Sequence, residues 1–184
     1  DFEIRDGRVI AAVTDRGRRE IDQVVIAGGA WSATLAAKLG HRVPLETHRG
    51  YHVMVADHNA GLRRNVAWVE RKFLATPMEH GLRFAGTVEI AGLQAPPDWR
   101  RADSLLRQGR EMFRELQHGE TSRWMGHRPC LPNSVPVIGQ SPKVANAYFA
   151  FGHGHIGLLS APATGHLVAE IVTGATPSID PTPY

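Results

Sequence analysis

The sequence contains a single cysteine, Cys130, so no disulfide can form within the chain. None of its apolar stretches is long enough to span a bilayer, which excludes a transmembrane helix. Charge of one sign is also scarce: the formal net charge is only +3, and the Lys and Arg residues are scattered along the chain. A nucleic-acid-binding function is therefore not indicated. One cysteine fits a reducing compartment, and we expect a cytoplasmic protein, with peripheral attachment at the inner membrane left open.

The length of 184 residues corresponds to one domain or two small ones, and the 42% hydrophobic content is that of an ordinary globular protein. No signal peptide opens the chain. It begins at Asp1 without an initiator Met, and the following Phe2-Glu3-Ile4 is typical of a strand. We therefore expect that this chain is part of a longer fold.

The first quarter of the chain combines short strands with one glycine turn. Residues 2–26 predict three short strands, with Asp6-Gly7 as a two-residue hairpin turn. The last of them, 23–27, is continuously apolar and β-branched, which favours a buried parallel strand. Gly28-Gly29-Ala30 follows, and residues 31–40 predict a helix. Such a turn lets a ligand approach the backbone, and it is equally compatible with an ordinary strand-to-helix connection.

The middle of the chain is rich in short strands. Residues 51–55, 66–69, 73–78 and 82–88 have strand character and predict an antiparallel sheet. Residues 101–117 carry apolar side chains at helical spacing and predict one helix.

The last third repeats the pattern of strand, glycine turn and helix. Three prolines make residues 121–139 an extended path broken by turns. Residues 147–151 predict a buried strand, and residues 152–157 form a glycine-rich turn. Residues 160–173 then predict a helix that Gly174 ends.

Four segments together resemble the FAD-dependent D-amino-acid oxidoreductases, the family of glycine oxidase, sarcosine oxidase and D-amino acid dehydrogenase. Their order and spacing match the C-terminal half of that family, and they cover nearly the whole chain. The segments are Val24–Ser32, Pro44–His52, Gly126–Gly139 and Phe149–Gly165. The family's N-terminal Rossmann segment is absent from this sequence.

The resemblance implies an α/β (α+β) fold with two parts. Residues 1–47 and 129–184 would be the remnant of an FAD-binding Rossmann-like domain. Residues 48–128 would be an antiparallel-sheet domain that binds the substrate. The implied reaction is oxidation of the C–N bond of a small amino acid, a D-amino acid by preference, to an imino acid and then a keto acid. FAD is the implied cofactor.

The resemblance also assigns roles to individual residues. Arg128 would bind the substrate carboxylate, because the planar guanidinium matches a carboxylate with two hydrogen bonds. Tyr51 and His155 would also contact the substrate. The residues expected at the cofactor are Ala27, Gly28, Gly29, Trp31, Arg49, Gly50, Gly152, His153, Gly154, Ile156, Gly157 and Leu158.

Several of these residues have structural alternatives. Tyr51 could be a half-buried strand residue, Arg49 could close the domain junction, and Trp31 could be a core residue. His153 and His155 have no acidic or cysteine companions at ligand spacing, so no metal site is predicted.

Two other functions remain compatible with the sequence. The chain could be a truncated fragment that folds, binds no FAD and is inactive. It could also be a non-enzymatic module that uses Arg128 to bind a carboxylate. The expected partners are a small amino-acid substrate and the missing N-terminal FAD-binding half, and self-association is plausible because the truncation would expose apolar surface.

Overall fold

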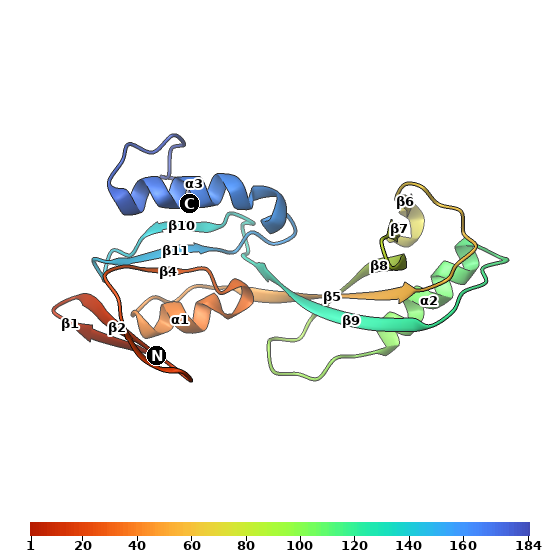
Figure 1. The fold of residues 1–184 in the computed structure, drawn as a ribbon, viewed down its shortest axis with the longest axis horizontal. Helices are drawn as coiled ribbons and strands as arrows, with labels where there is room; N and C mark the ends of the chain where they lie inside the picture. Colours follow the sequence, from red (N-terminus) through yellow and green to blue (C-terminus); the bar gives the residue numbers. More distant parts are fainter. The chain divides into compact units, whose positions relative to one another are not determined.

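The chain folds into two units, and the computed structural model describes all 184 residues (Figure 1). The first unit comprises residues 1–47 and 128–184, and the second comprises residues 48–127. Both units combine helices with sheets, which confirms the mixed α/β fold with antiparallel sheets. No helix in the structure combines the length and the apolar character needed to cross a membrane.

The first unit begins with an antiparallel sheet of β1 (Phe2–Arg5), β2 (Arg8–Thr14) and β3 (Gly17–Glu20). Asp6 and Gly7 both have positive φ, as a tight two-residue hairpin requires. The expectation of three strands in residues 2–26 was wrong, because β3 is an additional one. Its sequence Gly-Arg-Arg-Glu has no apolar residue and is fully exposed, so it forms only by pairing with β2.

The second sheet of this unit has the strand order β10 (Val137–Gln140), β11 (Ala147–Phe151), β4 (Val24–Ile26). The pairing of β4 with β11 is parallel, as expected for residues 23–27, but the expected burial was wrong for part of the strand, because Val25 is 41% exposed. A short 3₁₀ helix η1 (Gly29–Trp31) and α1 (Ser32–Lys38) follow β4. The core contains residues of β2, β4, α1 and β11, together with Leu39 after α1 and Val144 before β11; the residues of the four elements are Val9, Ile26, Ala36, Ala147, Phe149 and Phe151.

Helix α3 (Gly157–Thr173) closes the first unit and contacts β10 and β11. It ends at Gly174, which has φ of 72° and confirms the expected C-terminal cap. The helix begins three residues earlier than expected. Leu158 and Leu159 in its first turn are exposed, so no periodic apolar pattern marks this start.

The second unit is a five-stranded sheet with the order β6 (Val66–Trp68), β7 (Phe73–Met78), β8 (Gly81–Ile90), β5 (Glu46–Val55), β9 (Thr121–Cys130). A short 3₁₀ helix η2 (Val69–Arg71) connects β6 to β7. The pairings of β5 with β8, β6 with β7 and β7 with β8 are antiparallel, as expected. Helix α2 (Arg100–Met112) packs against β7 and β8. Their shared core is Tyr51, Val53, Val55, Phe73, Ala75, Leu82, Phe84, Ala102 and Leu105.

Helix α2 is shorter than the predicted 101–117. Phe113 leaves the helix with φ of −119° and ψ of 85°. Phe113 and Leu116 still pack on the core from the segment after the helix. The helical spacing of apolar residues therefore continues past the last turn of α2. From the sequence alone, this continuation looks the same as a longer helix.

Four histidines make stability depend on pH. Burial lowers the pKa of His41, His52, His127 and His153 below the ordinary 6.5, and a nearby cation adds to this for the first three. The unfolded chain therefore binds more protons than the folded chain once the pH falls below 6.5. We expect the urea midpoint to be lower at about pH 5.5 than at about pH 7.5. An unchanged or higher midpoint at the lower pH would contradict these shifts, and His153→Gln should flatten part of the dependence.

Candidate functional site

The first unit contains a cavity of about 430 Å³ where its two glycine turns meet α3. This volume lies within the range of small-molecule sites. Hydrophobic side chains and glycines dominate its wall. The lining residues are Val25, Ala27, Gly29, Pro129, Ala150, Phe151, Gly152, His153, Gly154, Gly157, Ala161, Thr164, Gly165 and Val168.

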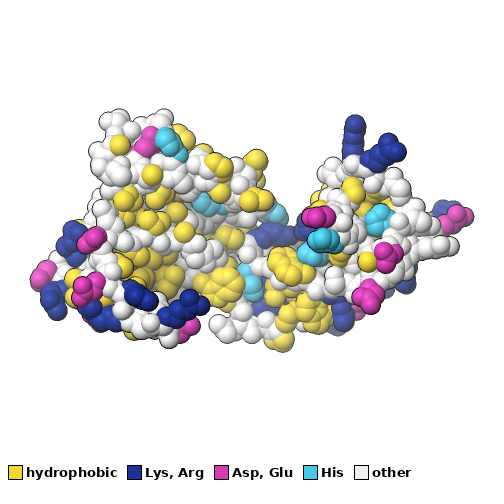
Figure 2. Space-filling model, in the orientation of Figure 1, with side chains coloured by type: hydrophobic (Ala, Val, Ile, Leu, Met, Phe, Trp, Pro, Cys, Tyr) yellow, Lys and Arg dark blue, Asp and Glu magenta, His cyan; other side chains and the backbone are white.

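Three elements supply this wall. The end of β4 contributes Ala27 and Gly29, and the end of β11 contributes the turn at 152–157. Helix α3 contributes Ala161, Thr164, Gly165 and Val168, whose spacing places them on one helix face. Hydrophobic side chains of this unit also gather between α3 and α1 (Figure 2).

The glycine turn after β11 has backbone dihedral angles that residues other than glycine rarely adopt. Gly152 has φ of 93° and Gly154 has φ of 56°, and a Cβ at Gly152 would collide with Leu131. The N–H of Gly154 donates to the carbonyl of Pro129 at 2.8 Å. The turn is therefore fixed in a form that lets a ligand approach the main chain closely.

A hydrogen bond of His153 connects this glycine turn to α3. Its Nε2 lies 2.9 Å from Oγ1 of Thr164, and both residues line the cavity. Burial lowers the pKa of the imidazole, so the neutral form is favoured. A neutral ring and a wall of small residues suit a flat, largely apolar group such as the ring system of FAD.

Most of the residues predicted to bind the cofactor in this unit line the cavity. They are Ala27, Gly29, Gly152, His153, Gly154 and Gly157. Gly28 packs instead against Leu35 and Ser32.

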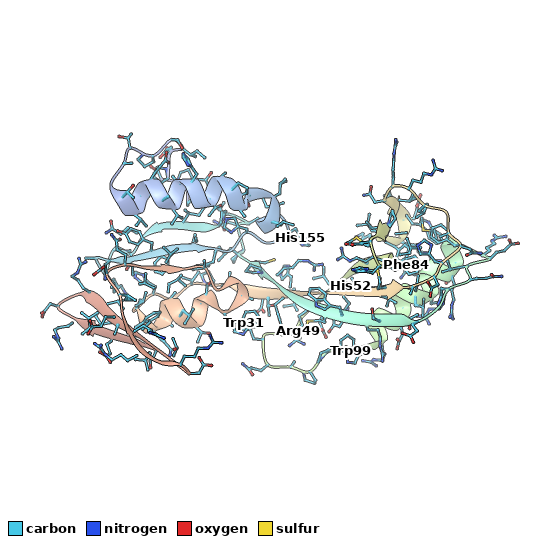
Figure 3. All side chains as sticks on the ribbon, viewed as in Figure 1. Trp31, Arg49, His52, Phe84, Trp99 and His155 are labelled. Carbon is cyan, nitrogen blue, oxygen red and sulfur yellow. The ribbon has the colours of Figure 1, made fainter.

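The other predicted residues of these turns are solvent-exposed outside the cavity wall. Trp31, Ile156 and Leu158 are 54%, 57% and 94% exposed. His155 is also exposed, and Figure 3 labels it together with Trp31. Both glycine turns therefore carry exposed large apolar side chains.

Arg49, Gly50 and Tyr51 belong to the second unit and are buried in β5. Arg49 is fully buried, and its guanidinium donates to the carbonyls of Gly92, Ala95 and Pro96. The Tyr51 hydroxyl donates to Glu89 and accepts from the N–H of Asp98. Burial and Glu89 raise the pKa of this phenol.

Arg128 is half-buried near the end of β9. Side chains alternate along a strand, so the neighbouring His127, in the second unit, shares a face of β9 with Met125. Met125 packs on the core of the second unit, and Arg49 contributes to the lowered pKa of His127. The predicted role of Arg128 in binding a carboxylate is considered below.

Sequence reasoning gave no individual role to part of the wall, although all of these residues except Val168 lie in segments that carry the resemblance: Val25, Pro129, Ala150, Phe151, Ala161, Thr164, Gly165 and Val168. It also missed a motif. Gly152, Gly154 and Gly157 have GxGxxG spacing between a parallel strand and a helix, which is the context expected for dinucleotide binding. That spacing is a second reason, beside the resemblance of Phe149–Gly165, to expect a ligand at the start of α3.

A larger cavity of about 730 Å³ lies beside the first sheet. Its wall contains Arg5, Arg8, Arg18, Glu20 and Asp22, and Arg18 pairs with Glu3 and Glu20. It contains none of the predicted site residues, and its open, strongly polar wall does not suit a flat apolar ring.

Comparison with known proteins places this site in context. The model of the family "FAD dependent oxidoreductase" matches residues 1–171. The chain belongs to the FAD-dependent oxidoreductase family. A D-amino-acid oxidase of Bradyrhizobium diazoefficiens is 39% identical over the whole chain. A glycine oxidase of Pseudomonas aeruginosa is 33% identical over 98% of it.

A solved structure of glycine oxidase from Geobacillus kaustophilus has the same fold as this FAD-dependent oxidoreductase chain. It matches with a TM-score of 0.81 and 25% identity over 94% of the chain. The chain spans about half the length of these relatives: 44% of the D-amino-acid oxidase, 50% of the Pseudomonas glycine oxidase and 47% of the solved one.

Proposed function

We propose that the intact protein is an FAD-dependent enzyme that oxidises the C–N bond of a small amino acid, with D-amino acids preferred. The observation that carries the proposal is the cavity between the two glycine turns and α3, in a chain of the FAD-dependent oxidoreductase family. The names of the relatives, D-amino-acid oxidase and glycine oxidase, support an amino-acid substrate.

Residues of the first unit would hold the cofactor in this cavity. Gly29, Gly152, Gly154 and Gly157 allow the main chain to approach a flat ring. The first N–H groups of α3 favour negative charge, because a helix N-terminus carries positive potential. When bound, FAD supplies the redox chemistry, accepting a hydride equivalent from the amine carbon.

The substrate would lose that hydride from carbon and a proton from nitrogen. The product is then an imino acid, which water converts into a keto acid and ammonia. We assign to Arg128 the binding of the substrate carboxylate, since its fork of N–H donors matches two carboxylate oxygens.

Replacing Arg128 by alanine is expected to lower kcat/KM for D-alanine by about 100-fold, because a charged, hydrogen-bonded partner of the substrate is lost. Arg128→Lys should fall between wild type and alanine, since it keeps the charge without the fork. Keto-acid formation by the FAD-loaded intact protein is the measurement. An unchanged kcat/KM in Arg128→Ala would overturn the role of Arg128, and absence of both bound FAD and turnover in the wild type would overturn the proposed enzyme.

A further inference from the structure

The first unit contains a further cavity, of about 640 Å³, at the C-terminal end of α3. Its wall is formed mainly by the segment after α1, by β10, which α3 contacts, and by the chain that follows α3 (Figure 1). It shares no lining residue with the cavity proposed for the flavin. It is therefore a separate site, and what it binds does not depend on the proposed function.

Apolar side chains make up most of this wall. Val43 and Phe149 also pack in the core of the first unit, so this part of the wall is fixed. Further apolar residues come from β10, α3 and the chain after α3: Val137, Ile138, Ile171 and Pro177. No aspartate or glutamate lines the cavity. The wall therefore suits the apolar part of a ligand and holds no acidic side chain that would repel an anion.

His41 supplies an oriented hydrogen-bond donor to this wall. Its Nε2 lies 2.7 Å from Oγ of Ser141, a buried hydroxyl that accepts the N–H groups of Lys143 and Val144. Because two donors already occupy the hydroxyl oxygen, its own hydrogen is directed to Nε2. Burial and the Lys143 cation lower the pKa of the imidazole, so the neutral ring carries its proton on Nδ1. The ring also packs edge-on against Phe149, with centroids 5.1 Å apart.

Arg42, the next residue, adds a positive charge to the same wall. Its side chain is exposed, lines the cavity and makes no hydrogen bond or ion pair in the structure. A second cation, Lys143, lies close to His41, and its ammonium group donates to the carbonyl of Gly40. A free guanidinium, a nearby ammonium and an oriented N–H are groups that bind a carboxylate.

We propose that this cavity binds an apolar carboxylate, with its carboxylate group at His41 and Arg42 and its hydrocarbon part along Phe149 and Ile171. Arg42 would supply charge and two parallel N–H donors, and His41 would supply the Nδ1–H. A neutral ligand of the same length leaves the charge of Arg42 unused, and an amine is repelled by it. The site therefore selects its ligand by charge as well as by apolar contact.

The first test compares three eight-carbon probes by calorimetric titration of the intact protein. Octanol has the chain of octanoate without the charge, and octylamine has the opposite charge. We expect octanoate to bind about tenfold more tightly than octanol, and octylamine to bind more weakly than octanol. Equal affinities for octanoate and octanol, or no octanoate binding at millimolar concentration, would overturn the inference.

Variants of the wall separate the two parts of the ligand. Arg42→Gln should weaken octanoate binding by about tenfold and leave octanol unchanged, because only the charge is removed. Arg19→Gln is the matched control: Arg19 is an exposed arginine of β3 that does not line this cavity, and its octanoate affinity should equal that of wild type. Ile171→Ala should weaken both probes by about fivefold, since apolar contact is lost. An unchanged octanoate affinity in Arg42→Gln would overturn the placement of the carboxylate.

A last measurement distinguishes this cavity from Arg128, to which the proposed function assigns a carboxylate. Octanoate should shift the NMR signals of the His41 imidazole, assigned with His41→Gln, and Arg128→Ala should bind octanoate as the wild type does. Loss of octanoate binding in Arg128→Ala, with the His41 signals unmoved in the wild type, would overturn the site at the end of α3. That result would leave the proposed function standing, and absence of FAD and turnover would leave this site standing.

Discussion

Replacing Arg49 by methionine is expected to lower the free energy of unfolding of the second unit by about 3–5 kcal/mol. The guanidinium is completely buried, donates to three carbonyls in the 92–96 segment and lies 3.6 Å from Glu89. Methionine can fill much of the volume but donates nothing. The three carbonyls would then remain buried without their donor, and the Glu89 carboxylate would keep only Arg101, 3.7 Å away, as its cation.

Urea unfolding followed by tryptophan fluorescence measures this effect. Arg100→Met is the matched control, because Arg100 is 89% exposed and pairs only with Asp98, so its midpoint should not change measurably. If Arg49→Met does not fold, adding Glu89→Gln should restore part of the stability by removing a mostly buried charge that has lost one of its two cations. Equal midpoints for Arg49→Met and wild type would show that the buried guanidinium has no stabilising role.

This prediction connects the fold to the predicted site. Arg49 fixes the loop after β8, and the same loop leads to Asp98, whose N–H donates to the hydroxyl of Tyr51. Glu89 contacts both Arg49 and Tyr51. Arg49, Tyr51, Glu89 and the loop after β8 therefore form one hydrogen-bonded cluster. These contacts favour a structural role for Arg49 and Tyr51.

The glycine turns were predictable because their chemistry is local. A β-branched run followed by Gly28-Gly29, or an aromatic run followed by Gly152, indicates where a strand ends and the chain must turn. The parallel pairing of β4 with β11 then brings the two turns together at one edge of the sheet. No residue pattern within either turn reveals this pairing.

The orientation of Tyr51 and His52 was not predictable from their spacing. Adjacent strand residues point to opposite faces, and the packing of α2 decides which face is the core. Alternation in the sequence is weak here, because Arg49 and Tyr51 are polar residues on the buried side. The stacking of Trp124 on His52 was not predictable for a similar reason, because it joins residues of two strands that are far apart in the sequence.

The presence of β3 and the end of α2 also depend on tertiary contacts that the local sequence does not show. β3 forms without apolar residues because β2 is available for pairing, and the 113–116 segment packs on the core although α2 has ended. In both cases a long-range contact overrides the local pattern.

Filling the cavity of the first unit tests the proposed cofactor site most directly. Gly165 lines the cavity, and a Cβ there would meet no atom within 4 Å, so Gly165→Leu can extend into the space without distorting α3. Leucine also favours a helix more than glycine does, so the fold should not be weakened. Ala169→Leu is the matched control, since Ala169 is exposed one turn further along α3 and does not line the cavity.

The measurement is the dissociation constant of FAD from the intact protein, obtained by quenching of flavin fluorescence. We expect Gly165→Leu to weaken FAD binding by about 100-fold, because the added side chain occupies the space of the ring, and Ala169→Leu to bind as the wild type does. Equal FAD affinity in Gly165→Leu and Ala169→Leu, with both proteins folded, would contradict the assignment of this cavity to the flavin.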